Sequence, residues 1–575
     1  MLKRVFSYMR EYKKYAWSGL LCIGVEVVLE ITVPLLMADL IDYGVTNADG
    51  TYIIKKGLQM ALCAVLALIL GVGSAKFSAL AGQGLGANIR KAEYEKLQSY
   101  SFSNIDHFSV SSLVTRLTSD VTNIQNAVST GMRPFGRSPV MLIFATSFAF
   151  RINSTLALVF LVALPTLAVL LILIIINVGP LYGRMQSAID QVNRCIQENL
   201  TAIRVVKSYV RGDYEVEKFG VVNENLKSES EKAFGTAVLN MPAMQFVMYG
   251  TILGILLIGG RLINEGQMMI GQLTSFLSYV LLILNSLMMM SNVFLLMTRS
   301  LASAERIMEV IDEKIDITDE NAKDIAVAKG EIEFDHVWFK YKDTAKEYVL
   351  SDVSFHIKPG QTVGIIGQTG SSKTTLVQLI PRLYDVTKGE VKIDGINVKE
   401  YPVRHLRDSV AMVLQKNTLF SGSLIDNLRW GNEKATLDEI KEACQIACVD
   451  EFVDRLADGY DTGMGQEGVN VSGGQKQRIC IARAILKKPK VLILDDSTSA
   501  VDTATEAKIR SGLAEKLPDM TKIIIAQRIS SVRHADQIII MDRGHVEAIG
   551  THESLLRDNQ IYQEIYASQK EGADL

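Results

Sequence analysis

A loop rich in glycine, serine and threonine, Gly367–Thr375, has the residue types that bind phosphate groups. It follows an apolar segment typical of a β-strand and opens a segment typical of a helix from Leu376. In this setting, backbone N–H groups and the helix N-terminus bind phosphate oxygens. We expect Lys373 to reach the β- and γ-phosphates of a nucleotide and Thr374 to ligate Mg²⁺. The residues expected to contact the nucleotide here are Gly367, Gln368, Thr369, Gly370, Ser371, Ser372, Lys373, Thr374 and Thr375.

Two consecutive aspartates, Asp495 and Asp496, follow the apolar run Val491–Leu494. The run predicts a buried parallel strand, and such strands deliver side chains to the sheet edge where open α/β sheets bind ligands. Asp495 is expected to hold the Mg²⁺ ion. Asp496 stands where hydrolysis of the bound nucleotide needs a general base. With the phosphate loop, this strand predicts a nucleotide-binding α/β domain.

A third motif, Ser472-Gly-Gly-Gln475, stands at the start of a predicted helix. Its small residues expose backbone N–H groups and a hydroxyl, which suit an anion because helix N-termini carry unpaired donors. An ordinary polar turn is the alternative interpretation.

The chain as a whole divides by composition. Its 575 residues are too many for one hydrophobic core, so two or more domains are expected. Long uncharged segments dominate up to about Arg299, whereas charges are evenly mixed beyond it. This pattern predicts an α-helical membrane domain at 1–305, a linker at 306–329 and the α/β phosphate-loop domain at 330–575. The net charge of −3 gives no reason to expect a nucleic-acid partner.

Six scattered cysteines do not indicate a metal site or an oxidising compartment. Cys444 and Cys448 lie four residues apart on a predicted helix, but no second pair stands at zinc-binding spacing. We therefore expect buried structural thiols. The polar start, Met1–Phe6, does not resemble a secretory signal.

Six segments are candidates for membrane-spanning helices, each of which needs about 20 largely apolar residues. In chain order they are Tyr15–Asp42, Gly57–Ala75, Ser138–Phe150, Ser154–Gly183, Ala233–Gly260 and Gly266–Thr298. The third is the weakest because it is short. It spans only if it extends through Met132–Gly136 with Arg137 snorkelling or facing protein.

Basic residues set the expected orientation. Lysine and arginine are frequent in residues 1–14, whereas the first hairpin, Tyr43–Ile54, contains neither. Since basic short loops lie on the cytoplasmic side, the N-terminus and the α/β domain are expected in the cytoplasm. The prediction is a multi-pass protein of the plasma membrane.

Two connections between the predicted spans are long and polar, at about 76–131 and 184–232. Helices that run well beyond the bilayer explain their length. Within them, Phe102–Leu113 and Thr201–Arg211 are candidates for short transverse helices. Ordinary solvated loops are the alternative.

Polar residues inside two predicted spans mark a candidate substrate cavity. Glu26 and Glu30 share one face of the first span, and a carboxylate in hydrocarbon costs at least about 2.5 kcal/mol, so both should face protein or water. They form either a cation-attracting cavity or a paired structural group. In the sixth span, Asn285, Met289 and Asn292 either line an adaptable pocket or serve packing and lipid contact.

The order of these motifs along the chain resembles that of the ATP-binding cassette (ABC) exporters, over essentially the whole sequence, which argues against a simple polar turn at Ser472–Gln475. The chain is similar to a half-transporter, with six spans fused to one cassette. The resemblance implies ATP and Mg²⁺ as cofactors and a second half-transporter subunit as partner, because two cassettes enclose two ATP molecules. It also implies contact with membrane lipid and a hydrophobic small-molecule substrate.

The resemblance also implies individual roles. Tyr341 stacks on adenine, Gln415 senses Mg²⁺ and the membrane domain, and Asp502 lies at the interface between cassettes. The two short cytosolic helices couple the domains, the first through its own cassette and the second through the partner's. Four residues contact the γ-phosphate of ATP held by the partner: Ser472, Gly473, Gly474 and Gln475.

Three positions in the nucleotide site depart from the family pattern. Asp496 replaces a glutamate, which withdraws the carboxylate by about 1 Å, and a misplacement on that scale can cost about 10²-fold in rate. Gln527 replaces a histidine, and its amide cannot take or give a proton near pH 7. Ser372 replaces a glycine, and its small side chain is expected to fit if its φ is negative.

These departures affect cleavage of ATP more than its binding. The chain therefore resembles the degenerate-site subunit of a bacterial heterodimeric multidrug exporter, a translocase whose signature loop completes the partner's competent site. Two alternatives stay open. One is a homodimeric exporter with slow hydrolysis, and the other is an ATP-binding regulator or gated pathway that does not pump.

Overall fold

The computed structural model describes residues 2–342, 344–497 and 500–571; some side chains within helices, among them that of Asn292, lie outside this description. The chain folds as two compact units. The first comprises Met1–Gln98 and Ser111–Asp312, and the second comprises Ser99–Val110 and Glu313–Leu575. The boundary at Asp312 falls within the segment 306–329 that we expected to link two domains.

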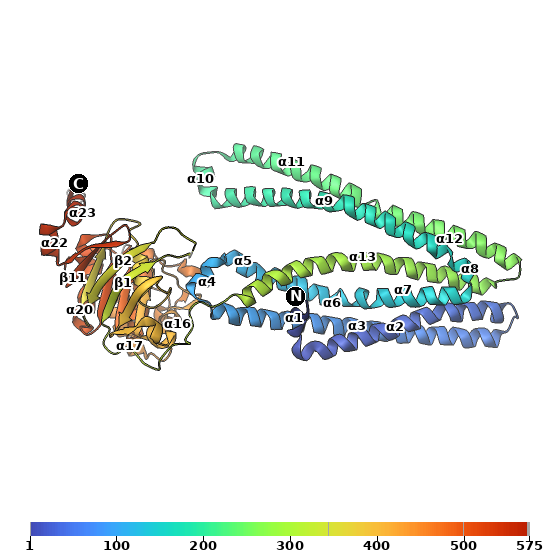
Figure 1. The fold of residues 1–575 in the computed structure, drawn as a ribbon, viewed down its shortest axis with the longest axis horizontal. Coiled ribbons are helices and arrows are strands. Elements are labelled where there is room, and N and C mark those ends of the chain that lie inside the picture. Colours follow the sequence, from blue (N-terminus) through green and yellow to red (C-terminus); the bar gives the residue numbers. More distant parts are fainter. Residues whose placement is uncertain (1, 343, 498–499, 572–575) are drawn as a thin grey trace. The chain divides into compact units, whose positions relative to one another are not determined.

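Long helices make up the first unit (Figure 1). α3 and α9 contain 49 and 43 residues, far more than the roughly 20 that cross a bilayer, which confirms the predicted helical extensions. The elements are α1 (Leu2–Ser7), α2 (Lys13–Asp39), α3 (Gly50–Gln98), α5 (Val110–Thr115), α6 (Val121–Ser129), α7 (Met132–Ile152), α8 (Ser154–Ala157), α9 (Val159–Thr201), α10 (Ile203–Ser208), α11 (Gly212–Ala237), α12 (Asn240–Asn264) and α13 (Ile270–Asp312).

Short helices form where the sequence predicted them. The segment Phe102–Leu113 contains α4 (Phe102–His107) and the start of α5, and Thr201–Arg211 contains α10. α4 begins with a capping box, in which Ser101 and Asn104 satisfy each other's backbone N–H groups. The alternative of unstructured loops is therefore wrong.

Five helical segments of the described chain are long and apolar enough to cross a membrane: Arg10–Val45, Gly50–Gln98, Ser154–Thr201, Gly212–Asn264 and Ile270–Met290. The predicted third span forms a helix of 21 residues, α7, but it is not among these five. Arg133, Arg137 and Arg151 lower its hydropathy. A six-span membrane domain stays a prediction.

The second unit contains two main sheets. The six-stranded sheet has the order β12-β11-β3-β10-β9-β6, and all its strand pairs are parallel except β11 with β12. The four-stranded antiparallel sheet has the order β2-β1-β4-β5. The strands are β1 (Ile332–Phe339), β2 (Leu350–Ile357), β3 (Thr362–Ile366), β4 (Lys388–Ile393), β5 (Ile396–Asn397), β6 (Val410–Val413), β9 (Val491–Asp495), β10 (Thr521–Ile525), β11 (Gln537–Asp542) and β12 (His545–Gly550).

Helices cover the six-stranded sheet. α14 follows the phosphate loop, α19 follows the Ser472 motif, and α20 follows Asp502. The helices of this unit are α4, α14 (Lys373–Gln378), α15 (Val403–Ser409), α16 (Leu424–Arg429), α17 (Leu437–Ile446), α18 (Asp450–Val453), α19 (Gly473–Leu486), α20 (Thr503–Lys516), α21 (Ile529–Val532), α22 (His552–Asp558) and α23 (Gln560–Glu571).

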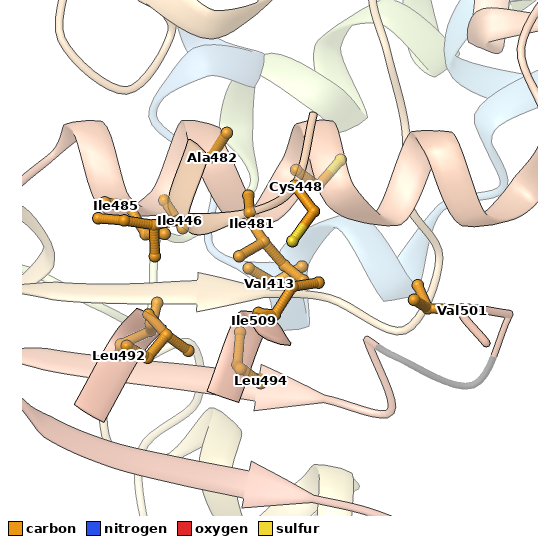
Figure 2. Close-up of a cluster of buried hydrophobic side chains, with 14 of the residues drawn as sticks. Val413, Ile446, Cys448, Ile481, Ala482, Ile485, Leu492, Leu494, Val501 and Ile509 are labelled. Atoms are coloured by element: carbon orange, nitrogen blue, oxygen red, sulfur yellow. The ribbon is translucent and has the colours of Figure 1, made fainter. Parts of the chain in front are cut away.

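Strand β9 is buried on both faces, which explains its unbroken apolar sequence. Because successive side chains of a strand point to opposite faces, Leu492 and Leu494 join one core cluster and Val491 and Ile493 join the other. Figure 2 shows Leu492 and Leu494 on the side of β9 toward the α19 residues Ile481 and Ile485. The predicted buried parallel strand is confirmed.

The cysteines of this unit are packed as structural thiols. Cys444, Cys448 and Cys480 lie in the core cluster around β9 and are at most 7% exposed. Burial raises the pKa of the Cys480 thiol and that of Cys448. These thiols are therefore unreactive at neutral pH.

Candidate nucleotide-binding site

Neighbouring parallel strands bring the predicted site residues to one sheet edge. β10 lies between β3 and β9, so the phosphate loop after β3, Asp495 at the end of β9 and Gln527 after β10 share this edge. Asp496 continues the ladder, since its N–H donates to the carbonyl of Ile525 at 3.1 Å. The topology, rather than any single motif, therefore assembles the site.

The phosphate loop closes around its own lysine. Lys373 Nζ donates to the carbonyl oxygens of Gly367 and Gln368, both at 2.8 Å, and to Ser371 Oγ at 3.2 Å. Burial lowers the pKa of Lys373, while Asp496 and Asp495 oppose this shift. A Cβ at Gly367 would lie 2.2 Å from the carbonyl oxygen of Met541, so only glycine fits there. These contacts fix the loop that surrounds the phosphate position.

Ser372 has a left-handed backbone. Its φ is +71°, so the condition under which we expected the serine side chain to fit, a negative φ, is not met. The left-handed region costs an L-residue about 1–2 kcal/mol, which glycine does not pay. Ser372 directly precedes α14, so the loop takes this conformation at the point where it turns into the helix.

Asp495 and Thr374 form a pair of oxygen ligands. Thr374 Oγ1 donates to Asp495 Oδ1 at 3.0 Å, and the Asp495 side chain is 1% exposed. Its other oxygen, Oδ2, is buried without a hydrogen-bond partner among the described residues. An unpartnered buried carboxylate oxygen is costly, and Mg²⁺ prefers oxygen ligands of this kind. The residues therefore fit the predicted Mg²⁺ ion.

Asp496 and Gln527, the two positions that we expect to be altered in the nucleotide site, are in direct contact. Gln527 Nε2 donates to Asp496 Oδ2 at 3.0 Å. Burial raises the pKa of the Asp496 carboxyl, and hydrogen bonds from Gln527 and Gln415 oppose this rise. Asp496 also has a positive φ of 49°. Three predicted site residues thus meet at one carboxylate, and no sequence pattern indicates the contact between Asp496 and Gln527.

The Ser472 motif caps its own helix. Ser472 Oγ accepts the N–H of Gln475 at 3.3 Å, and Gln475 Oε1 accepts the N–H of Ser472 at 2.8 Å. A Cβ at Gly474 would lie 2.7 Å from the carbonyl oxygen of Ala500, so the motif packs closely against the segment after β9. The pattern Ser-x-x-Gln is that of a capping box, a signal that can be read directly from the sequence.

Asp502 is also a helix cap. Its carboxylate accepts the N–H of Thr505 at 2.9 Å at the start of α20, and this bond lowers the pKa of Asp502. The signal was an aspartate directly before a helix. Its position between two cassettes stays a prediction.

Tyr341 connects the predicted adenine position with the phosphate loop. Its hydroxyl lies 2.9 Å from Thr375 Oγ1, and the residue is 44% exposed, which leaves ring surface for a base. Its ring packs edge-on against Tyr384, whose hydroxyl donates to Asp106 of α4 at 2.6 Å. The expected contact between the first coupling helix and its own α/β domain is therefore confirmed.

The polar residues of the first span are paired with arginines of α7. Glu26 Oε1 lies 2.6 Å from Arg133, and Glu30 Oε2 lies 2.6 Å from Arg137. Gly71 leaves room for this group, since a Cβ there would lie 3.1 Å from Glu26 Oε1. The pairing favours the structural interpretation over a cation-attracting cavity, because the two acids and two bases balance.

These ion pairs border a cavity of about 800 Å³ within the first unit. Glu26, Glu30 and Asn285 line it, together with apolar residues of α2, α3 and α13. Met289, 36% exposed, is not among its lining residues. Asn292 lies outside the described side chains.

Two families match the chain. The ABC transporter transmembrane region matches residues 17–287, and the ABC transporter domain matches residues 350–499. The two matches cover the helical unit and the phosphate loop together with the Asp495 strand.

Relatives match over the whole length. The chain is 38% identical over 575 residues to an uncharacterized ABC transporter ATP-binding protein, YfiB, of Bacillus subtilis, covering 100% of both chains. It is 31% identical over 588 residues to a putative multidrug export ATP-binding/permease protein, YgaD, of the same organism, covering 99% of both. A bacterial Atm1-family ABC exporter with ATP bound superposes with a TM-score of 0.82 at 23% identity, covering 97% of this chain and 99% of that one.

The structural match shows the fold, and the sequence matches show the family. The α/β domain is an ATPase coupled to transport, and it lies in the cytoplasm beside a multi-pass membrane domain. The chain belongs to the ABC transporter family and carries the membrane region and the ATP-binding domain of such a transporter in one polypeptide.

Proposed function

We propose that the chain is one subunit of a heterodimeric ABC exporter, and that its own phosphate loop forms the ATP site that hydrolyses poorly. The observation that carries the proposal is the contact between Asp496 and Gln527. Both residues depart from the family pattern, and both act on the same step, the activation of water. Their contact makes them one altered unit rather than two independent substitutions.

The geometry at Asp496 supports slow cleavage. Its carboxylate is about 1 Å shorter in reach than a glutamate, and it already accepts a hydrogen bond from Gln527. An amide at position 527 donates a hydrogen bond but transfers no proton near neutral pH. The Asp496 carboxylate is therefore poorly placed to activate water, and Gln527 cannot take over the proton transfer.

The groups that hold ATP are intact by contrast. Lys373 lies within the phosphate loop, and Thr374 and Asp495 offer oxygen atoms to Mg²⁺. The Ser472 motif, which serves the opposite site in this family, keeps its hydroxyl and both glycines. The chain can thus retain ATP at its own site and complete a competent site on a partner.

The membrane domain supports export of amphipathic drugs or lipid-like compounds. α7 supplies the third of six spans in this proposal, since two of its three arginines, Arg133 and Arg137, form ion pairs with Glu26 and Glu30. The cavity beside them combines these polar groups with apolar walls, as ligand pockets commonly do. The match to a putative multidrug export protein agrees with transport out of the cell and with this substrate class.

Purification of the full-length chain, alone and with the subunit that co-purifies, tests the proposal. We expect little ATP turnover by the chain alone and substantial turnover by the pair, together with export of a hydrophobic dye by membrane vesicles. Substantial turnover by the chain alone would support the homodimeric alternative. A pair that binds ATP and never hydrolyses it would support the regulator.

A matched pair of variants tests the assigned asymmetry. Ser472→Arg should abolish turnover of the heterodimer, because the bulky side chain blocks the partner's site. Ser472→Ala loses the same helix cap but leaves the site open, so it controls for damage to α19. Unchanged turnover in Ser472→Arg would contradict the asymmetry.

A further inference from the structure

The last helix of the chain, α23, is firmly packed on the ATP-binding domain. Tyr562 is fully buried, and its hydroxyl lies 2.7 Å from His552 Nδ1. Ile561 and Ile565 pack against the same core cluster as β9. The helix therefore offers a rigid support for whatever its final turn contacts.

A single side chain in that final turn binds the switch segment at two points. Gln569 Nε2 donates to the carbonyl oxygen of Gln527 at 2.8 Å. Gln569 Oε1 accepts the N–H of Ile529, also at 2.8 Å. One amide thus spans the backbone on both sides of Arg528, and it fixes the peptide group at the altered switch position.

The N–H of Ile529 lacks a side-chain cap from the neighbouring N-cap residue. Ile529 is the first residue of α21, and the N-cap residue, Arg528, makes no side-chain cap. The N–H groups of a first helical turn have no intrahelical acceptor, so Gln569 supplies a cap from a distant part of the chain. Without it, the segment between β10 and α21 loses two of its fixed bonds.

The connection continues to the carboxylate in the nucleotide site. Gln569 fixes the backbone of Gln527, and the Gln527 side chain donates to Asp496 Oδ2 at 3.0 Å. A shift of that backbone moves the amide relative to the site. Even a small displacement of the Gln527 amide matters, because a polar group interacts with a phosphate only within hydrogen-bond distance.

We propose that Gln569 is a positioning residue of the nucleotide site, through which the C-terminal helix α23 sets the switch segment around Gln527. The residue touches no nucleotide in this arrangement. It acts through Gln527. In a site that hydrolyses ATP slowly, it affects how long MgATP stays bound, and in a competent site it affects turnover. The expected effect on MgATP retention requires only that the chain binds ATP, as its family does, and does not depend on the proposed heterodimer.

The chain offers a matched control on the same helix. Gln563 Nε2 donates to two backbone carbonyls, those of Leu556 at 2.8 Å and Arg557 at 3.1 Å, but these belong to α22. Gln563→Leu therefore removes a comparable amide that does not contact the switch segment. Gln569→Glu is a second variant, which keeps an acceptor for Ile529 and loses the donor to Gln527.

The test measures the release of radiolabelled MgATP from the full-length transporter in lipid nanodiscs, with thermal unfolding recorded for every variant. Loss of two fixed hydrogen bonds should make at least one phase of release about fivefold faster in Gln569→Leu, with a smaller change in Gln569→Glu and none in Gln563→Leu. Release curves identical to wild type in a folded Gln569→Leu protein would overturn the proposal. An equal change in Gln563→Leu would overturn it too, because the effect would then be general destabilisation.

A second readout separates this proposal from the proposed function. In the variant Asp496→Glu with Gln527→His, the added change Gln569→Leu should lower kcat several-fold and leave KM for ATP nearly unchanged. If Asp496→Glu with Gln527→His gains no turnover, the proposed degenerate site fails, while the release assay on the otherwise wild-type chain still decides the role of Gln569.

Discussion

The phosphate-holding part of the proposed site and its water-activating part come from neighbouring strand ends, yet we expect them to respond differently to small changes of a side chain. Backbone N–H groups, Lys373 and the pair of Thr374 with Asp495 would share the binding of the phosphates. We therefore expect ATP binding to tolerate the strained serine at position 372. Activation of water would depend on one carboxylate and its neighbour, the two positions that we propose are altered. Cleavage would then require the placement of a single group within about 1 Å, whereas binding would not.

Removal of the loop lysine is the strongest way to break this contrast. Lys373→Ala takes away the ammonium group that lies among the loop carbonyls, so ATP affinity should fall on the order of 10²-fold. Titration calorimetry on the full-length chain measures this, with exposed Lys358→Ala as control. Near-normal affinity in Lys373→Ala would mean that the loop does not hold the triphosphate.

The metal pair should matter next. Asp495→Asn keeps the volume of the side chain but removes the charge that faces Mg²⁺, so MgATP affinity should fall about tenfold. Affinity for ATP in excess chelator should change much less. An equal loss with and without Mg²⁺ would indicate that Asp495 serves folding only.

The water-activating part should be nearly insensitive. In the proposed heterodimer, Asp496→Asn should change total turnover by less than about twofold, because the partner's site would carry the hydrolysis. If Asp496 were essential to the chemistry, its misplacement alone would cost about 10²-fold. Steady-state ATPase assays decide this. A tenfold loss would show that the site of this chain contributes to turnover.

Relief of strain at Ser372 should have the smallest effect. Ser372→Gly removes a left-handed penalty but adds freedom to the unfolded chain, so stability should rise by less than about 1 kcal/mol. Thermal unfolding of the nucleotide-free protein measures the change. A lower melting temperature would mean that the Ser372 side chain stabilises the loop.

Much of the site could be predicted because its chemistry prescribes residue types. Phosphate binding requires small residues and a lysine between a strand and a helix, and Mg²⁺ requires an acid at a strand end. The backbone of Ser372 could not be read, since a serine side chain does not reveal φ. The contact of Asp496 with Gln527 depends on the register of β9 against β10, which no local pattern encodes.

The same limit applied to the membrane domain and the chain end. The α7 helix was weak as a predicted span because its arginines lower its hydropathy. The pairing of Arg133 and Arg137 with Glu26 and Glu30 is visible only in three dimensions. Gln569 lies 42 residues beyond Gln527, in a segment without a recognisable motif. Contacts between distant segments set these features, and single-sequence patterns carry little information about them.

The decisive measurement is ATP turnover by the chain's own site after both altered positions are restored. With the partner's site blocked by the corresponding loss of its phosphate-loop lysine, the wild-type heterodimer should show almost no hydrolysis. The variant Asp496→Glu with Gln527→His should then gain up to about 10²-fold in turnover. The central claim is that this site holds ATP without cleaving it because Asp496 and Gln527 cannot activate water. Substantial turnover before restoration would contradict this claim, and so would an absence of turnover after restoration.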